Sequence, residues 1–314
     1  MHATPHWDPA QYLRHAGHRA RPFLELLARI PELPAGAPGA VPAGRDGGLP
    51  GGGPRIADLG CGPGNVTALL ADRWPTARIT GFDLSEDMLA RARKEYAGPT
   101  PGGGSLDFRP ADLTGWRPGA GTDAGSGAGP GTAPGPDSGS GADPGEEPYD
   151  LIVSNAALQW VPGHEELFAA WTAGLRPGGT FAFQVPGNFD APSHRLLAAL
   201  CDGPRWRARL SGHGERPAPV LEPAGYLARL GALGCAADVW ETTYLQLLPG
   251  PDPVLDWVKG TALRPVLTAL ADDPQAADAF LAEYRDLLRE AYPPGPHGTV
   301  FPFRRIFAVA VKEA

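Results

Sequence analysis

The chain has 314 residues, enough for one large domain or two small ones, and a formal net charge of −8. A protein that follows a nucleic-acid backbone usually carries a basic face, so this charge argues against a nucleic-acid partner. The sequence holds no run of 18 apolar residues and no apolar stretch near its start, which predicts neither a membrane span nor a secretory signal.

The three cysteines, Cys61, Cys201 and Cys235, lie far apart in the sequence. Their number is odd, and no metal-ligand spacing of Cys or His occurs. We therefore expect neither a disulfide framework nor a metal site, and a reducing, cytoplasmic compartment.

Residues 8–30 have the pattern of helix. Asp8 and Gln11 can form a capping box at its start, and Gly17 and Pro22 are expected to divide the segment into two short helices. We expect these helices to close as a lid over a bound ligand. The alternative is that they only pack against the rest of the domain.

Two segments, 34–54 and 118–147, consist almost entirely of Gly, Pro, Ala, Ser, Thr and Asp. Such segments cannot bury enough apolar area to offset the entropy lost on ordering. We predict that both are disordered insertions in a single domain that spans 1–314.

Short apolar runs and amphipathic segments alternate between these insertions and beyond them. This alternation at βαβ spacing predicts a parallel sheet with helices on both faces. The expected strands are 55–60, 78–84, 106–113, 149–156 and 179–185, and the expected helices are 66–74, 86–96 and 165–175.

The pattern changes after residue 186, where helices are expected at 191–201, 223–231, 252–271 and 274–291. Strands at 235–248 and 304–312 can pair antiparallel and close one edge of the sheet. We therefore predict an α/β, Rossmann-like, mostly parallel sheet of seven strands whose last strand is antiparallel. Residues 188–221 and 250–300 would supply a helical cap that covers a substrate.

The sequence DLGCGPGN at 58–65 follows a strand and precedes a helix. Glycines 60, 62 and 64 allow a tight turn and a close approach of the backbone to a ligand. A turn of this kind also begins a dinucleotide fingerprint. Two details argue against that reading: the acidic residue Asp58 precedes the glycines, and Pro63 removes one N–H from the turn.

Two further aspartates follow later strands. Asp83 ends the second strand, where a carboxylate can accept both hydroxyls of a ribose; because Ser85 is available to cap the next helix, Asp83 is not needed as a cap. Asp112 ends the third strand and suits an amino group such as the exocyclic nitrogen of adenine. A solvent-facing turn residue is the alternative for Asp112.

Residues 58–65, Asp83, Asp112 and the sequence SNAALQW at 154–160 together resemble the motif series of class I S-adenosylmethionine-dependent methyltransferases. The resemblance runs from residue 55 to about 187 and implies S-adenosylmethionine as cofactor. By this match the first acidic residue and the glycines hold the methionine part, the second holds ribose and the third holds adenine. The implied cofactor-binding residues are Asp58, Gly60, Gly62, Asn65, Asp83, Leu84, Met88, Asp112, Leu113 and Asn155.

A narrower resemblance covers nearly the whole chain. The sequences WDPAQYL at 7–13, SNAALQW at 154–160, WVKGTALRP at 257–265 and FPFRR at 301–305 are similar to the trans-aconitate methyltransferase family. This implies methyl transfer to a carboxylate of a small polycarboxylate, giving a monomethyl ester, by an enzyme we expect to be monomeric. The two Gly/Pro-rich insertions depart from the family pattern.

A carboxylate is already ionised at neutral pH, so we expect no indispensable proton-transferring residue. Gln159, Trp160 and Arg264 are expected to position the acceptor. A polycarboxylate also needs cations, although most Lys and Arg side chains only solvate the surface. The expected substrate-binding residues are Tyr12, Trp160, Trp257, Lys259, Arg264 and Arg304, with Arg305 as a weaker candidate.

Three other readings remain open. The same fold can methylate a hydroxyl, amine or carbon, which needs a base near Asn155–Trp160, with His164 as the candidate. A nicotinamide-dependent oxidoreductase is a different class of enzyme with a similar turn. A sensor that binds adenosylmethionine without turnover is the third.

Overall fold

The computed structural model describes residues 16–33, 52–119, 147–214 and 220–313. Within these residues, nine strands form one sheet in the order β3-β4-β2-β1-β5-β6-β9-β7, with β8 paired to β9. The strands are β1 (Arg55–Leu59), β2 (Arg78–Asp83), β3 (Gly98–Pro99), β4 (Ser105–Pro110), β5 (Tyr149–Asn155), β6 (Leu175–Pro186), β7 (Cys235–Leu248), β8 (Pro294–Gly295) and β9 (Gly298–Lys312).

The Rossmann-like architecture is confirmed, with two short strands more than expected. Strands β4, β2, β1, β5 and β6 are parallel, whereas β9 runs antiparallel between β6 and β7. The additional strands, β3 and β8, have two residues each, so seven strands of five or more residues remain in the described chain. Chain order reverses between β1 and β5, and a sheet of this type binds ligands at the carboxyl ends of its strands beside such a reversal.

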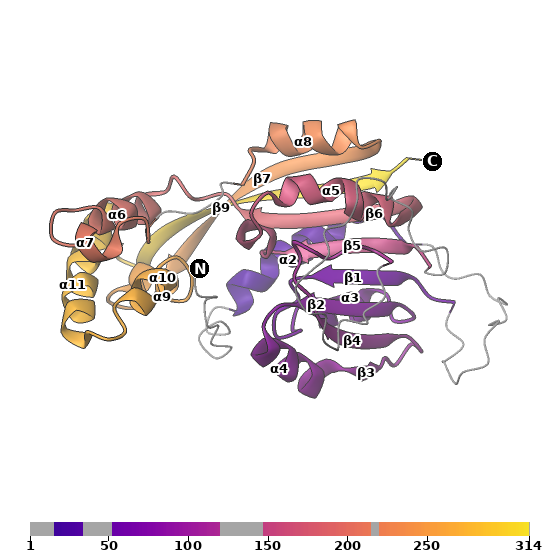
Figure 1. The fold of residues 1–314 in the computed structure, drawn as a ribbon, viewed down its shortest axis with the longest axis horizontal. Coiled ribbons are helices and arrows are strands. Elements are labelled where there is room, and N and C mark those ends of the chain that lie inside the picture. Colours follow the sequence, from indigo (N-terminus) through magenta and orange to yellow (C-terminus); the bar gives the residue numbers. More distant parts are fainter. Residues whose placement is uncertain (1–15, 34–51, 120–146, 215–219, 314) are drawn as a thin grey trace, which may run out of the picture.

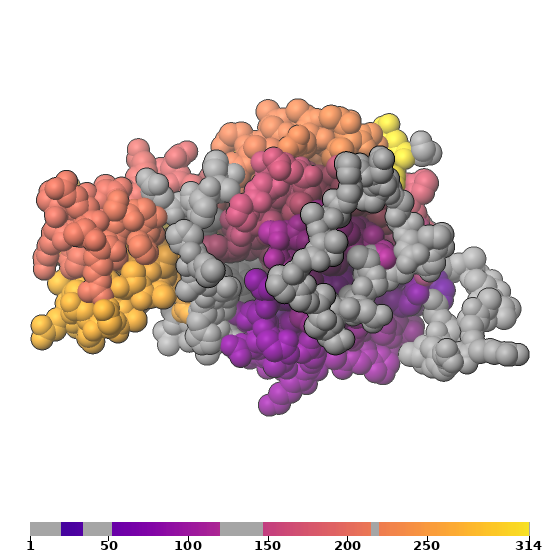
Figure 2. Space-filling view, viewed as in Figure 1, coloured from indigo at the N-terminus to yellow at the C-terminus, as the bar shows by residue number. Residues whose placement is uncertain are grey.

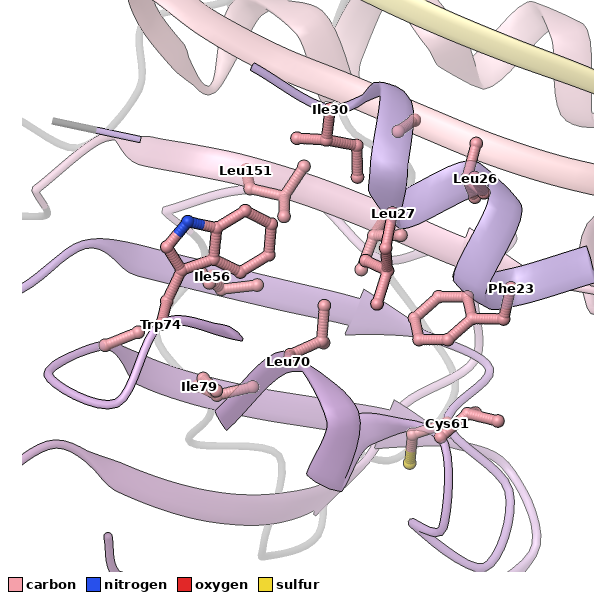
Figure 3. Close-up of a cluster of buried hydrophobic side chains, with 14 of the residues drawn as sticks. Phe23, Leu26, Leu27, Ile30, Ile56, Cys61, Leu70, Trp74, Ile79 and Leu151 are labelled. Carbon is pink, nitrogen blue, oxygen red and sulfur yellow. The ribbon is translucent and has the colours of Figure 1, made fainter. Parts of the chain in front are cut away.

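Helices cover both faces of the sheet (Figure 1). One face packs against α2 (Ala16–Arg29), α3 (Thr67–Arg73) and α4 (Glu86–Tyr96), and the other against α5 (His164–Ala173) and α8 (Pro223–Ala232). In Figure 3, Phe23 and Leu27 of α2 point toward Leu70 of α3 and Ile56 of β1. Apolar burial on each face therefore fixes the sheet whose edge carries the candidate site.

A separate group of helices forms the cap at one end of the molecule (Figure 1). These helices are α6 (Pro192–Cys201), α7 (Arg207–Leu210), α9 (Pro253–Lys259), α10 (Arg264–Ala269) and α11 (Pro274–Ala291). They share a third apolar cluster that includes Trp257, Phe280 and Phe301. Figure 2 shows the same division on the surface, with the cap beside the elements that cover the sheet.

Strands β7 and β9 connect the sheet to the cap. The pairing of β9 with β6 ends at Arg305 and Pro186, but its pairing with β7 continues to Thr299 and Leu248. The continued part is a two-stranded ribbon whose residue Phe301 is fully buried in the cap cluster. Because β9 runs through both parts, its residues at the junction lie between the sheet and the cap.

Several expected boundaries differ from the structure. The expected division of the first helix at Pro22 is wrong, because α2 continues through this buried residue and packs on the sheet through Phe23, Leu26 and Leu27. The segment 252–271 forms two helices, since Gly260 ends α9 before α10 begins. The strand expected at 106–113 ends at Pro110, and β9 begins six residues before the expected position 304.

Some expectations lie outside the described residues. They include the capping box of Asp8 and Gln11, Tyr12, and most of the segments 34–54 and 118–147. The described part of 8–30, helix α2, packs against the sheet. Within the described ranges, no helix has the length and apolar character needed to cross a bilayer.

Candidate functional site

The glycine turn after β1 lies against the end of β2. The backbone N–H groups of Gly60 and Cys61 both donate to the carbonyl oxygen of Phe82, at 2.7 and 3.0 Å. Gly60 has φ +77°, and a Cβ there would lie 2.2 Å from the Cβ of Ala157. Gly62 has φ +55°, but a Cβ there would meet no atom within 4 Å. The turn is thus closely packed at Gly60 and faces open space at Gly62.

Asp58 lies fully buried beneath this turn. Its Oδ2 accepts a hydrogen bond from Thr67 Oγ1 at 2.7 Å, whereas its buried Oδ1 has no hydrogen-bond partner in the described residues. Burial raises the pKa of Asp58 to about 7; the Thr67 hydrogen bond lowers it and the Asp83 charge raises it. Asn65 Oδ1 is a second buried acceptor to which none of the described residues donates a hydrogen bond. A ligand that donates N–H bonds would satisfy such acceptors.

Asp83 joins the end of β2 to the glycine turn. Its Oδ2 accepts from the Gly62 N–H at 2.8 Å and its Oδ1 accepts from the Ser85 N–H at 2.9 Å. Burial raises the pKa of Asp83, while these N–H groups lower it. As expected, the cap of α4 is Ser85, whose Oγ accepts from the Met88 N–H.

Asp112 follows β4 at the same edge. The Ala111 N–H donates to the Asp83 carbonyl at 2.9 Å, which places Asp112 beside the end of β2. Asp112 is exposed, and its Oδ1 accepts from the backbone N–H and hydroxyl of Thr114 at 2.9 and 2.8 Å. The structure therefore brings the glycine turn, Asp83 and Asp112 to one edge, formed by the carboxyl ends of β1, β2 and β4.

Three apolar residues expected to bind the cofactor lie at this edge. Leu84 is 61% exposed, whereas Met88 and Leu113 are buried. A Cβ at Gly60 would lie 3.9 Å from Leu113 Cδ1, so Leu113 packs beside the glycine turn. The exposed Leu84 beside the half-buried Asp83 is a surface that an apolar ring can cover.

A cavity with about 720 Å³ of empty space, its open mouth included, lies where the ends of β5 and β6 meet the cap. Ala156, directly after β5, has φ +54°; it is the one non-glycine residue with positive φ in the described chain. The lining residues are Asn155, Ala156, Gln159, Trp160, Pro186, Asn188, Phe189, His194, Trp257, Val258, Thr261, Phe301, Phe303 and Arg305.

The charge and the polar groups of this cavity come from few side chains. Arg305 is 4% exposed, its Nη1 donates to Gln184 Oε1 at 2.9 Å, and its guanidinium carbon lies 4.8 Å from the Phe303 ring centroid. Gln184 Nε2 in turn donates to Asn155 Oδ1 at 2.6 Å. Asn188 is 5% exposed, and neither polar atom of its side chain has a hydrogen-bond partner in the described residues.

The structure brings four of the expected residues, Asn155, Gln159, Trp160 and Trp257, to the cavity, together with the weaker candidate Arg305. The prediction that Arg304 binds the substrate is corrected, because its guanidinium pairs with Glu222 and Glu241 instead. Successive side chains of a strand point to opposite sides, and in β9 the buried series Phe301, Phe303 and Arg305 faces the cavity.

The other two expected cations also lie elsewhere. Lys259 pairs with Asp256 on the outside of α9, and Arg264 begins α10 without lining the cavity. Both follow Trp257 in the sequence, but Trp257 lines the cavity and they do not. The residues that sequence reasoning missed are Asn188, Phe189, His194, Thr261 and Phe303.

His164, the candidate base, does not reach the cavity. It is 2% exposed, its Nε2 lies 2.7 Å from Tyr226 Oη, and it packs between α5 and α8. Burial lowers the pKa of His164, and the Glu165 charge raises it. His194 is instead the histidine that lines the cavity among the described residues.

Two binding regions therefore lie side by side. The glycine turn and acidic strand ends offer an edge for a nucleoside-like ligand, and the cavity under the cap offers space for a second molecule. Asn155 and Ala156 belong to the cavity, while Ala157 contacts the turn at Gly60. This arrangement is typical of a Rossmann-like enzyme that acts on small molecules.

Comparison with known proteins identifies the class of enzyme. Residues 12–222 match the family model described as a methyltransferase domain, and the chain belongs to this family. A protein of Streptomyces coelicolor named trans-aconitate 2-methyltransferase is 61% identical over 99% of this chain and 89% of its own length. A Streptomyces avermitilis protein of the same name is 59% identical, over 99% of both chains.

More distant relatives carry the same name. The trans-aconitate 2-methyltransferase of Rhodococcus jostii is 42% identical over 97% of this chain and 98% of its own length. Among solved structures, phosphoethanolamine N-methyltransferase 2 of Haemonchus contortus aligns with 94% of this chain and 53% of its own at 16% identity, with a TM-score of 0.47. That similarity is too low to carry an argument about function.

Proposed function

We propose that this chain transfers a methyl group from S-adenosylmethionine to a carboxylate of trans-aconitate, giving a monomethyl ester and S-adenosylhomocysteine. The relatives named for this activity, 61% and 59% identical over 99% of the chain, support the proposal. The structural observation that carries it is the buried Arg305 in a cavity beside the glycine turn. A buried cation in a substrate cavity is the group that an anionic acceptor requires.

The residues at the sheet edge fit this cofactor. The unpartnered oxygens of Asp58 and Asn65 can accept from an ammonium group, and the open space at Gly62 leaves room for a ligand against the turn. We assign the ribose hydroxyls to Asp83 and the adenine amino group to Asp112. The remaining proposed contacts are Gly60, Leu84, Met88, Leu113 and Asn155.

When bound, the cofactor supplies a methyl group on a positively charged sulfur. That methyl group would pass to a carboxylate oxygen of the acceptor, and the sulfur would keep the electron pair of the C–S bond. The acceptor is already ionised at neutral pH, so the chain need not remove a proton. Its residues instead align the reacting atoms and exclude water, an effect worth up to about 7–11 kcal/mol.

The cavity residues divide this work. Arg305 binds an acceptor carboxylate that does not react, and Asn188 donates to a second one from its buried amide. Trp257, 2% exposed, forms part of the wall, and Trp160, 39% exposed, lies at the cavity surface. Arg264, Lys259 and Arg304 have no part in this assignment.

A second candidate is the same enzyme acting on a hydroxyl, amine or carbon of another small molecule. One observation favours it: His194 lines the cavity, and a histidine can serve as a base for an acceptor that must lose a proton.

We also propose a lid role for residues 8–30, disorder for 34–54 and 118–147, a cytoplasmic location and a monomeric state.

Incubation with methyl-labelled S-adenosylmethionine and a panel of acceptors tests the proposal. The panel holds trans-aconitate and other di- and tricarboxylates, together with hydroxyl and amine acceptors that lack carboxylates. We expect labelled monomethyl esters, most from trans-aconitate, which mild alkali hydrolyses. Label that appears only in alkali-stable ethers or amines would overturn the proposal in favour of the second candidate.

A further inference from the structure

A row of three hydrogen-bonded side chains crosses the sheet below the cavity. Gln184 lies on β6 and is fully buried, and its register partners are Asn155 on β5 and Phe307 on β9. Its Oε1 accepts from Arg305 Nη1 at 2.9 Å, and its Nε2 donates to Asn155 Oδ1 at 2.6 Å. The two outer members line the cavity, whereas Gln184 does not.

The chemistry of arginine fixes the direction of every bond in this row. A guanidinium only donates hydrogen bonds, so the atom of Gln184 that faces Arg305 must be its oxygen. The amino group of Gln184 then faces Asn155, which must present its own oxygen in return. The Nδ2 amino group of Asn155 therefore points away from Gln184, and Asn155 lines the cavity.

The orientation of this amide matters because its two ends have opposite polarity. An inward amino group donates to an anion, whereas an inward oxygen repels one. An asparagine side chain can exchange the two ends by rotation about its last torsion angle. A glutamate at position 184 could also accept from Arg305, but it would neutralise the charge of Arg305 and offer Asn155 only an acceptor.

We propose that Gln184 is a positioning residue for Asn155. Because Arg305 can only donate, Gln184 presents its oxygen to Arg305 and its amino group to Asn155, and so holds the Asn155 amino group as a carboxylate donor in the cavity. This inference rests on the proposed function, which supplies two carboxylate ligands. One is a carboxylate of the acceptor, and the other is the carboxylate at the amino-acid end of the cofactor. The chemistry at Asn155 is the same for both.

A double-mutant cycle with Gln184→Met and Asn155→Ala tests the coupling. Met has the length of Gln but makes no comparable hydrogen bond. Calorimetry with S-adenosylhomocysteine reports the cofactor arm without any turnover, and the KM for trans-aconitate reports the acceptor arm. We expect each single variant to weaken the same one of these two constants by at least tenfold. The constant of the double variant should then be no worse than that of the more strongly affected single variant, because Gln184 acts through Asn155.

The constant that changes identifies the carboxylate that Asn155 binds. If the losses multiply, or if folded Gln184→Met leaves both constants at the wild-type value, the proposal is wrong and Gln184 is only structural. Circular dichroism and the thermal midpoint establish folding for each variant.

A second variant covers the case in which Gln184→Met does not fold. Gln184→Glu retains the contact with Arg305 but turns Asn155 around, so it should weaken the same constant as Asn155→Asp, which also presents an acceptor to the cavity. A wild-type constant in Gln184→Glu would contradict the proposal. If the wild-type protein esterifies no acid at all, the proposed function fails. Calorimetry with S-adenosylhomocysteine still tests whether Gln184 positions Asn155.

Discussion

Exchanging Arg305 and its neighbour Arg304 for lysine, one at a time, distinguishes the cation in the cavity from the cation on the surface. Arg305 is 4% exposed and lines the cavity, whereas Arg304 pairs with Glu222 and Glu241 outside it. Lysine retains the charge but cannot form two parallel hydrogen bonds with one carboxylate. Arg305→Lys therefore loses about one charge-assisted hydrogen bond to the acceptor, worth roughly 1.5–3 kcal/mol.

This loss corresponds to a rise of about 10- to 150-fold in the KM for trans-aconitate. Arg304→Lys is the matched control: the ion pairs of Arg304 are partly solvated and worth about 1 kcal/mol or less each, so stability changes little and KM stays constant. Steady-state kinetics with saturating cofactor measures both variants, and calorimetry with S-adenosylhomocysteine checks the cofactor site. An unchanged KM in Arg305→Lys, or an equal rise in Arg304→Lys, would refute the assignment.

Three further predictions concern the sheet edge. Asp83→Ala should weaken S-adenosylhomocysteine binding by at least about 100-fold, because two charge-assisted bonds to ribose are lost; unchanged affinity by calorimetry would exclude the ribose role. The raised pKa of Asp58 means that the folded protein without ligand holds a proton that the unfolded chain has released, so stability should fall by up to about 4 kcal/mol as pH rises from 4 to 7. Denaturant titrations should show this slope flattened in Asp58→Asn, and an equal slope in both proteins would contradict it. Gly60→Ala should lower the thermal midpoint more than Gly62→Ala, because only the Cβ at 60 meets another residue, at 2.2 Å; equal shifts would contradict the packing.

The sheet and its ligand edge could be predicted because both depend on local patterns. Strands and helices that alternate at βαβ spacing lead to a parallel sheet, and parallel strands end at one edge. The placement of Asp83 and Asp112 beside the glycine turn follows from that rule alone. Their hydrogen bonds do not, since the bond from Gly62 to Asp83 depends on the conformation of the turn.

The cavity was harder to predict because it forms between segments far apart in the sequence. The choice between Arg304 and Arg305 had a signal, since Phe301, Phe303 and Arg305 alternate with more polar or exposed neighbours in the pattern of a half-buried strand. Asn188 had none. It follows β6 in a loop, and its burial depends on the cap, where the Ser193 N–H after this loop donates to Tyr292 Oη at 3.0 Å from the end of α11.

A crystal structure with S-adenosylhomocysteine and trans-aconitate bound together measures the arrangement of the two sites most directly. We expect the ribose hydroxyls on Asp83, and the tricarboxylate beside Arg305 and Asn188 with one carboxylate facing the sulfur. If the nucleoside lies away from the glycine turn, or the acid binds outside the cavity under the cap, the arrangement described for this chain is incorrect.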